Sequence, residues 1–496
     1  MPQNIDLLII KPGSPKIMYG DLSKSLSAIE PPYLAVLLAA FIREKGYSVK
    51  IIDTEIEELD IGNPVLVNII VAGQTPSASS TPLMVVSGEI IKKLKAKIPE
   101  IKTILTGIHP SALPERTLRE EKPDFIGRGE NFYTILELLK TLKSGKKTEN
   151  YNIQGLWYLK DNKVVSNGWG RLVQDLDELP IPAWELLQMD KYRAHNWHCF
   201  GHINERTPYA VIYTSFGCPY NCTYCNIRAL YDNKPGIRFR SAERIVEEID
   251  LLVNKYKVKN IKFCDELFAI NSDRVNQLCD LLDQRDYNLN IWAYARINTV
   301  DERILRKMKR AGINWLGYGI ESGSQKIRTG VSKAQFKQDE IKKIVTMTKD
   351  AGIYVGGNYI FGLPDDNLKT MQETLDLAKE LNCEMANFYT AMAYPGSKLY
   401  EQSLEQGIKL PDTWLGYAQL NEETFPLPTK YLSSSEVLRF RDKAFQEYYS
   451  SPRYLEMIKE KFGQETVGHI KEMFEYKIKR KFVGTRGVYF RKRPYN

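Results

Sequence analysis

Three cysteines within one short segment are the residues best suited to metal chemistry. Cys218, Cys222 and Cys225 are spaced as C-x3-C-x2-C. Three thiolates can ligate three irons of a [4Fe–4S] cubane and leave the fourth iron without a protein ligand. S-adenosylmethionine (SAM) can chelate that iron through its amino and carboxylate groups, and an electron delivered to the sulfonium then breaks a C–S bond. The spacing therefore predicts a [4Fe–4S] cluster with one iron open to a chelating ligand of this kind.

Two other roles for cysteine stand against this prediction. A structural zinc site needs a fourth Cys or His at suitable spacing, and Cys199 and His202 lie upstream. Cysteine is also often a plain core residue. We interpret Cys264, Cys279 and Cys383 in that way, because each stands alone on a strand or helix pattern.

The cysteines directly follow the first strand of a long strand–helix series. Six runs are predicted as strands: Ala210–Thr214, Asn260–Cys264, Asn290–Ala295, Trp315–Ile320, Tyr354–Ile360 and Met385–Thr390. Helical patterns separate them, at Ala242–Tyr256, Ser272–Arg285, Asp301–Ala311, Asp339–Asp350 and Asn367–Leu381. Six units are too few for an eight-fold barrel, so we expect a partial (β/α)6 TIM-like barrel over residues 208–400. Its active residues should gather at the carboxyl ends of the strands.

Residues 1–147 form an earlier α/β series. Its predicted strands are Ile5–Ile10, Ser48–Asp53, Val65–Val71, Lys102–Thr106 and Asp124–Gly127. Amphipathic stretches lie between them, which predicts a doubly wound, Rossmann-like parallel sheet. Ligands of such sheets bind beyond the strand carboxyl ends, here in the loops Lys11–Gly20, Ala72–Thr81, Gly107–Leu118 and Gly127–Asn131. None of these loops carries GxGxxG, which disfavours a nicotinamide or flavin site.

Two further segments complete the predicted α/β organisation. Residues 148–207 contain a hairpin, Gly155–Lys160 with Lys163–Asn167, and a proline-rich linker. Residues 401–496 form a mainly helical C-terminal region with a basic end. We interpret that end as a solvated or packed helix and expect no nucleic-acid partner.

The composition is that of an ordinary globular protein, with 43% hydrophobic and 26% charged residues and a formal net charge of +8. No segment reaches the roughly 18–20 uninterrupted apolar residues of a transmembrane helix. The N-terminus has neither a basic region nor a small-residue cleavage site, so export is not expected. We therefore expect a cytoplasmic, reducing location, in which the seven cysteines do not form a disulfide framework.

The segment from Ser215 to Cys225 resembles the radical SAM superfamily, in which C-x3-C-x-aromatic-C follows the first barrel strand. The resemblance covers roughly Tyr209 to Pro395 and implies that the three cysteines bind the cluster. It also implies SAM contacts at the strand ends. Tyr224 would pack near the adenine, Asp265 or Glu266 would receive the amino group, and Arg296 would pair with the carboxylate as a bidentate fork. The remaining implied contacts are Glu321 and Ser322 with the ribose or carboxylate, and Gly362 with the adenine.

The N-terminal series resembles the cobalamin-binding radical SAM enzymes. The likeness is carried by motifs in order: Glu30–Ala35 (EPPYLA), Thr106–Pro110 (TGIHP), Ala112–Glu115 (ALPE), Gly127–Asn131 (GRGEN) and Leu179–Leu187 (LPIPAWELL). The implied corrin contacts are Pro12, Gln74, Thr75, Gly107, His109, Gly129 and Glu130. A D-x-H-x-x-G motif is absent. We therefore interpret His109 as a loop histidine and expect cobalamin to bind without a protein histidine on cobalt.

The resemblance implies methylation of an unactivated carbon or phosphorus of a small-molecule or lipid substrate. One SAM would supply the methyl group to cobalamin, and another would give the 5′-deoxyadenosyl radical that abstracts a substrate hydrogen. An electron donor such as flavodoxin or ferredoxin would reduce the cluster. Radical cyclisation or rearrangement with the same cofactors, as in porphyrin-type cyclases, remains an alternative, as does a radical enzyme that has lost cobalamin. A non-catalytic iron–sulfur protein that transfers electrons or binds nucleic acid is a further class.

Overall fold

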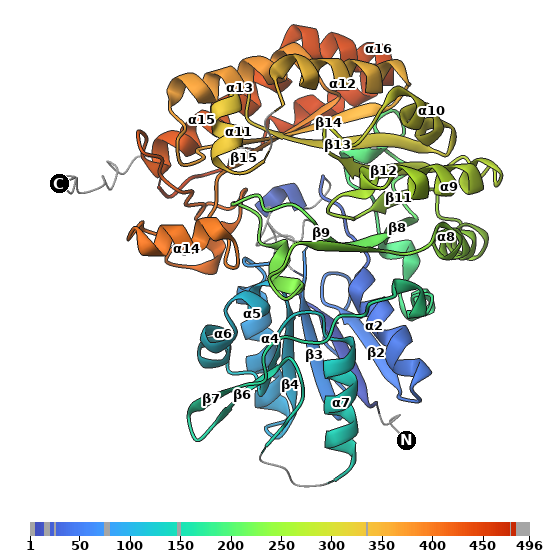
Figure 1. The fold of residues 1–496 in the computed structure, drawn as a ribbon, viewed down its shortest axis with the longest axis vertical. Coiled ribbons are helices and arrows are strands. Elements are labelled where there is room, and N and C mark those ends of the chain that lie inside the picture. Colours follow the sequence, from blue (N-terminus) through green and yellow to red (C-terminus); the bar gives the residue numbers. More distant parts are fainter. Residues whose placement is uncertain are drawn as a thin grey trace.

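The computed structural model describes residues 5–13, 20–23, 26–73, 80–145, 150–333, 336–476 and 478–482. An N-terminal α/β domain lies below a partial barrel, and a helical C-terminal region covers the barrel (Figure 1). One continuous hydrophobic core runs from one face of the N-terminal sheet through the linker into the barrel. A second core covers the other face of that sheet.

The N-terminal sheet has seven strands in the order β2-β1-β3-β4-β5-β6-β7. Its five parallel strands are β1 (Leu7–Lys11), β2 (Val49–Asp53), β3 (Leu66–Val71), β4 (Thr103–Gly107) and β5 (Phe125–Gly127). Helices α2 (Tyr33–Glu44), α4 (Met84–Lys97) and α7 (Phe132–Lys143) pack on it. The apolar runs are buried because both faces of the sheet are covered. The predicted Rossmann-like sheet is confirmed.

An antiparallel hairpin extends this sheet. Strands β6 (Leu156–Lys160) and β7 (Lys163–Ser166) join the edge strand β5, so the hairpin belongs to the N-terminal sheet and not to the linker. Its turn residues Asp161 and Asn162 have φ values of 48° and 59°. Positive φ at both central residues is the geometry of a two-residue type I′ turn.

The segment after β4, which the sequence indicates as a loop, is mostly helical. It forms α5 (Ile108–Ala112) and α6 (Pro114–Glu121). Gly107 makes the turn possible, because its φ is 119° and a Cβ there would lie 2.3 Å from the carbonyl oxygen of Val71. Pro114 suits the first position of α6, where no backbone N–H is needed.

The barrel sheet is fully parallel, in the order β15-β14-β13-β12-β11-β8. Its strands are β8 (Tyr209–Ile212), β11 (Asn260–Phe263), β12 (Asn290–Ala295), β13 (Ile313–Glu321), β14 (Tyr354–Phe361) and β15 (Met385–Thr390). The outer helices are α8 (Ala242–Tyr256), α9 (Ser272–Asp283), α10 (Glu302–Arg310), α11 (Gln325–Gly330), α12 (Gln338–Asp350) and α13 (Leu368–Leu381). The two edge strands β8 and β15 are not paired with each other, which confirms the open six-stranded barrel.

A short antiparallel ribbon, which the sequence does not predict, carries the cysteine segment. It consists of β9 (Ser215–Cys218) and β10 (Gly236–Phe239). Only two residues separate β8 from β9, so the sequence pattern merges the two strands. Cys218 ends β9, and the loop between the two strands contains the other two cysteines.

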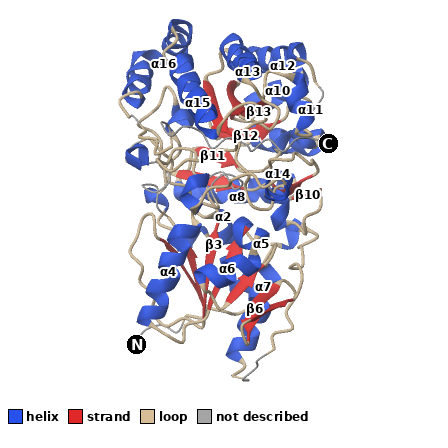
Figure 2. Ribbon diagram, turned by 90° about the vertical axis from the view of Figure 1, so that its left-hand side faces the viewer, coloured by secondary structure: helices blue, strands red, loops and turns tan. Residues whose placement is uncertain are grey.

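The C-terminal region contains α14 (Lys398–Glu405), α15 (Ser434–Tyr449) and α16 (Pro452–Met473). Figure 2 shows α15 and α16 beside the barrel strands, away from the N-terminal domain. Tyr448, Tyr449 and Tyr454 tie this region to β15 and its approach, because their hydroxyls donate to the carbonyls of Cys383, Ala386 and Glu384 at 2.6, 2.7 and 3.0 Å. In the described part of the chain, no helix has the length and apolarity that crossing a membrane requires.

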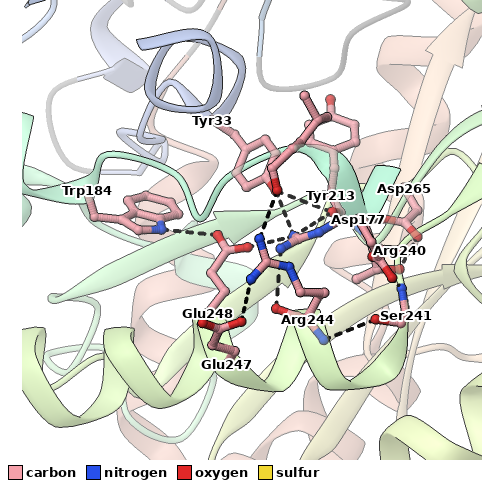
Figure 3. A network of polar contacts seen from close by, with 12 residues as sticks. Tyr33, Asp177, Trp184, Tyr213, Arg240, Ser241, Arg244, Glu247, Glu248 and Asp265 are labelled. Carbon is pink, nitrogen blue, oxygen red and sulfur yellow. Dashed lines mark hydrogen bonds and ion pairs between the residues drawn. The ribbon is translucent and has the colours of Figure 1, made fainter. Parts of the chain in front are cut away.

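A buried polar network joins the N-terminal domain, the linker and the barrel (Figure 3). Arg240 pairs with Glu248 at 2.6 Å and also donates to the hydroxyl of Tyr33 at 2.8 Å. Trp184 of the linker donates its indole N–H to Glu248 at 3.1 Å. Tyr33 begins α2, whereas Glu248 lies on α8. The network therefore fixes how the two domains sit on each other.

Candidate active site

A cavity of about 790 Å³ lies on the concave side of the barrel. All six barrel strands contribute to its wall, and so do Leu26, Ser27 and Glu30 of the N-terminal domain. Helix α15 and the segment after α16 complete the lining.

The three motif cysteines all line this cavity. None of them is in a disulfide, and all are partly exposed. Burial raises the pKa of the Cys218 thiol and raises that of Cys225 to about 12. Among the described residues, no three His, Cys, Asp or Glu side chains converge on a point that could hold a single metal ion. Three thiols in one cavity wall match the three protein ligands of a [4Fe–4S] cluster with an open iron better than the four ligands of a structural zinc ion.

Backbone contacts hold the cysteine loop against the rest of the barrel. The N–H of Cys225 donates to the carbonyl of Cys222 at 3.1 Å, which closes a turn. Asn226 donates its side-chain amide to the carbonyl of Pro395 at 3.1 Å. Gly217, with a φ of 94°, lies where a Cβ would be 2.4 Å from the carbonyl oxygen of Gly236. The ribbon therefore needs glycine immediately before the first cysteine.

The structure separates the two acidic candidates at the end of β11. Asp265 is buried behind the cavity wall, where it accepts hydrogen bonds from the Thr214 N–H at 2.6 Å and the Ser215 hydroxyl at 2.7 Å. Glu266 lines the cavity, and neither of its carboxylate oxygens has a hydrogen-bond partner in the part of the chain that the structure describes. Burial raises the pKa of Glu266 to about 8. Glu266 is thus the acidic side chain that is free to meet a ligand.

Arg296 lies beside the cysteine loop. Its guanidinium carbon is 3.7 Å from the ring centroid of Tyr220, and Nη1 is 3.8 Å from Sγ of Cys222. Its Nη2 donates to the carbonyl of Lys333. The residue lines the cavity, so its charge is directed at the space next to the thiols.

Glu321, Tyr224 and Lys333 also line the cavity, and the carbonyl of Lys333 accepts the hydrogen bond from Arg296. The Nζ atom of Lys333 lies 2.7 Å from Oε1 of Glu321. Glu321 has a φ of 66°, which is uncommon for a residue with a side chain. A Cβ at Gly319 would lie 2.5 Å from both groups of the ion pair, so glycine makes room for it.

Two of the expected SAM contacts do not reach the cavity. Ser322 is fully buried behind it and shares a hydrogen bond of 3.1 Å with the hydroxyl of Thr374. Gly362 packs against α15, where a Cβ would lie 2.4 Å from Val437. The glycine is explained by close packing of α15, and Asn358 and Ile360 of β14 line the cavity in its place.

The expected corrin contacts lie at the carboxyl edge of the N-terminal sheet, where the structure describes them. Pro12 is buried directly after β1, and Gly107 ends β4. Gly129 donates its N–H to the hydroxyl of Ser111 at 2.9 Å. Gln74 and Thr75 lie outside the described residues.

Glu130 and His109 have protein partners in this structure. Glu130 pairs with Arg238 at 2.6 Å and accepts from the N–H of Val173 at 2.9 Å, so its carboxylate joins the two domains. Nδ1 of His109 is 3.2 Å from the hydroxyl of Thr81, and its ring packs edge-on against Trp414 at 4.5 Å. Burial lowers the pKa of His109 to about 3. The imidazole is therefore neutral and enclosed, and it lies on the short helix α5 where the sequence indicated a loop.

Sequence reasoning missed several cavity residues. They include Lys333 between two helices, Trp292 inside β12 and Arg441 on α15. Each stands alone in its local pattern, and only the packing of distant segments brings it to the cavity. No motif in the sequence could have identified them.

Two family models match the chain: the B12 binding domain over residues 22–139 and the radical SAM superfamily over residues 212–378. An uncharacterised methyltransferase of Pyrococcus horikoshii is 29% identical over 465 residues, which cover 93% of this chain and 94% of the relative. The anaerobic magnesium-protoporphyrin IX monomethyl ester cyclase of Rubrivivax gelatinosus is 26% identical over 327 residues, 65% of this chain and 57% of the relative.

The chain superposes with a TM-score of 0.68 on a solved structure of the radical SAM methyltransferase TsrM from Kitasatospora setae. That structure contains cobalamin and a [4Fe–4S] cluster. The alignment covers 91% of this chain and 90% of that one at 16% identity. A likeness at this identity concerns the fold, and it confirms the predicted fold class of parallel sheet, partial barrel and helical end. With a B12 binding domain followed by a radical SAM domain, the chain belongs to the cobalamin-binding radical SAM enzymes.

Proposed function

We propose that this enzyme methylates an unactivated carbon or phosphorus atom of a small molecule or lipid held in the barrel cavity. One observation carries the proposal: the three cysteines, Glu266 and Arg296 line a single cavity that the N-terminal domain also helps to enclose. Groups for holding a cluster and for binding SAM are thus next to space for a substrate.

The chain's own residues would act by binding and positioning. The thiolates of Cys218, Cys222 and Cys225 would hold the cluster at the cavity wall, Glu266 would accept a hydrogen bond from the amino group of SAM, and Arg296 would pair with its carboxylate. When bound, the cluster supplies an electron for radical formation from SAM, and cobalamin supplies methyl-transfer chemistry. No protein base is required for removal of a hydrogen atom.

The apolar part of the cavity would protect the reaction from water. Trp292, Phe388, Phe445 and Met473 contribute to its lining. Positioning the reactants and excluding water are the protein's share of catalysis in cofactor enzymes. An electron donor such as flavodoxin or ferredoxin would reduce the cluster.

Radical cyclisation is the second candidate, because a cyclase is among the relatives. The methyltransferase relative, however, is covered over 94% of its length, whereas the cyclase is covered over 57%. The match over almost the full length of the methyltransferase favours methyl transfer over cyclisation.

The test uses the holoenzyme, reconstituted anaerobically and given SAM with a trideuterated methyl group plus a small-molecule and lipid extract. We expect a CD3-labelled product together with 5′-deoxyadenosine and S-adenosylhomocysteine, and we expect the labelled product only when cobalamin is supplied. Labelled product from cobalamin-free enzyme would refute the proposal. 5′-Deoxyadenosine without any S-adenosylhomocysteine would instead support cyclisation or rearrangement.

A further inference from the structure

Arg441 is a buried cation in the cavity wall that the proposed chemistry does not use. It lies on α15, lines the cavity and is only 8% exposed. Its Nε donates to the carbonyl of Phe388 at 2.7 Å, and its Nη1 donates to Oδ1 of Asp442 at 2.9 Å. Its Nη2 donates no hydrogen bond to any residue that the structure describes. The N–H groups of Nη2 are therefore available to a ligand.

The charge around Arg441 is also incompletely balanced. Asp442 is shared with a second arginine, because Nη2 of Arg480 lies 2.9 Å from Oδ1 and its Nε lies 3.0 Å from Oδ2. The remaining Nη1 of Arg480 donates to the carbonyl of Asn421 at 2.9 Å and to the hydroxyl of Thr424 at 2.8 Å. Two guanidinium groups thus share one carboxylate, which leaves one positive charge in excess. Since every nitrogen of Arg480 that can donate has a partner, the excess is available at Arg441.

Two other buried cations in this cavity are balanced by carboxylates, and Arg296 is already assigned to the SAM carboxylate. Lys262 lies 2.9 Å from Glu30, and Lys333 lies 2.7 Å from Glu321. The same side of the cavity contributes apolar side chains to the lining, namely Met385, Phe388, Phe445, Met473, Phe474 and Ile478. An unbalanced guanidinium in such a wall is costly unless a ligand anion completes it.

We propose that Arg441 binds an oxyanion of the substrate, a carboxylate or a phosphate, and that the substrate is an anionic molecule with an apolar body. This inference rests on the proposed function, because it concerns the occupant of the same cavity. Arginine suits the task, since its planar fork binds carboxylate and phosphate through charge-assisted hydrogen bonds. The oxyanion would be fixed at the C-terminal wall, and the apolar body would extend along the barrel toward the cysteine loop.

A purely structural role explains only part of this geometry. The bond from Nε to Phe388 connects α15 with β15, as a clamp would. It explains neither the free Nη2 nor the second arginine on the same carboxylate. A neutral glutamine or methionine could serve as a spacer at this position without introducing an excess charge.

The experiment measures binding of dodecanoate, dodecyl phosphate and dodecan-1-ol to the reconstituted holoenzyme, below their micelle-forming concentrations. We expect at least one anionic probe to bind wild-type enzyme about ten- to hundred-fold more tightly than the alcohol, the range of a charge-assisted hydrogen bond. A preference for dodecanoate indicates a carboxylate site, and a preference for dodecyl phosphate indicates a phosphate site. Equal binding of all three probes overturns the proposal, and this comparison needs no variant.

Variants test whether Arg441 causes the tighter binding of the anionic probes. Arg441→Gln should remove it, and Arg441→Lys should keep part of it because the charge remains. Arg439→Gln is the matched control, because Arg439 lies on the same helix and is exposed. An anion preference that survives in Arg441→Gln would overturn the assignment. Failure of wild-type enzyme to transfer methyl groups, with the anion preference intact, would refute the proposed function and leave this binding site in place.

Discussion

Replacing Arg240 by methionine tests the buried connection between the two domains. Glu248 is completely buried, and Arg240 is the cation that it contacts, at 2.6 Å. In Arg240→Met the carboxylate would lose the cation with which it forms its ion pair. A buried carboxyl then protonates, because keeping the charge would cost more.

The magnitude follows from the pKa of the group. The ordinary pKa of Glu248 is 4.5, and burial already raises it in the intact protein. Keeping the Glu248 carboxyl protonated in the folded variant at pH 7 lowers the free energy of unfolding by about 3 kcal/mol, since each pH unit above 4.5 costs about 1.36 kcal/mol. This agrees with the roughly 3–5 kcal/mol expected when one partner of a buried ion pair is removed. The cost is present at neutral pH and declines as the pH falls toward 4.5, by at most about 1.4 kcal/mol per unit.

The assay is anaerobic unfolding in guanidinium chloride at pH 6, 7 and 8, followed by tryptophan fluorescence. Arg43→Met is the matched control, because Arg43 and Glu185 form an exposed ion pair with side-chain exposures of 44% and 47% between α2 and the linker. Such a pair is worth about 0–1 kcal/mol. Adding Glu248→Gln to Arg240→Met should restore much of the stability and remove the pH dependence, since an amide can still accept from Trp184. The reasoning is refuted if Arg240→Met is no more destabilising than Arg43→Met.

Three further predictions concern single positions. Gly107→Ala should lower the free energy of unfolding by about 3 kcal/mol or more in chemical denaturation, because a Cβ there would lie 2.3 Å from the Val71 carbonyl oxygen. Gly46→Ala is the control: a Cβ there would meet nothing within 4 Å, so only the positive φ should cost stability, about 1–2 kcal/mol. His109→Ala should leave the electron paramagnetic resonance spectrum of bound cob(II)alamin unchanged, and loss of a nitrogen splitting would contradict the expectation that His109 does not ligate cobalt. Burial raises the pKa of Asp366 from 3.8 to about 6, so ionisation of Asp366 opposes folding. The free energy of unfolding of Asp366→Asn should therefore increase by up to about 3 kcal/mol relative to that of wild type as the pH rises from 4 to 7. A difference in unfolding free energy that does not change with pH would contradict this.

Local patterns were sufficient to predict most of the fold. The strands were recognisable because each is a short apolar run bounded by turn residues, and the two sheets appear at nearly the predicted positions. The ribbon of Ser215–Cys218 with Gly236–Phe239 was missed, because its partner strand lies across a loop and its residues carry no alternating pattern. The hairpin at Leu156–Ser166 was predicted, but its attachment to the N-terminal sheet depends on a contact with β5 that no local signal shows.

The site could be predicted only where spacing in the sequence sets the geometry. The three cysteines lie in one loop and reach one cavity together. Asp265 and Glu266 are neighbours, and the direction of each side chain depends on where β11 ends, which fixes only Glu266 toward the cavity. Gly362 has the sequence pattern of a ligand-approaching glycine, yet the neighbour that requires it is Val437. Lys333 and Arg441 reach the cavity through tertiary packing alone.

The central claim is that Cys218, Cys222 and Cys225 hold a cluster that cleaves SAM at the barrel cavity. The direct measurement is 5′-deoxyadenosine formed by anaerobically reconstituted enzyme with SAM and dithionite, compared between wild type and Cys222→Ala and paired with iron and sulfide analysis. We predict about four irons per chain and 5′-deoxyadenosine formation in the wild type, and neither in the variant, which should still bind cobalamin. Wild-type levels of 5′-deoxyadenosine from the variant, or none from wild type with a full cluster, would contradict the account.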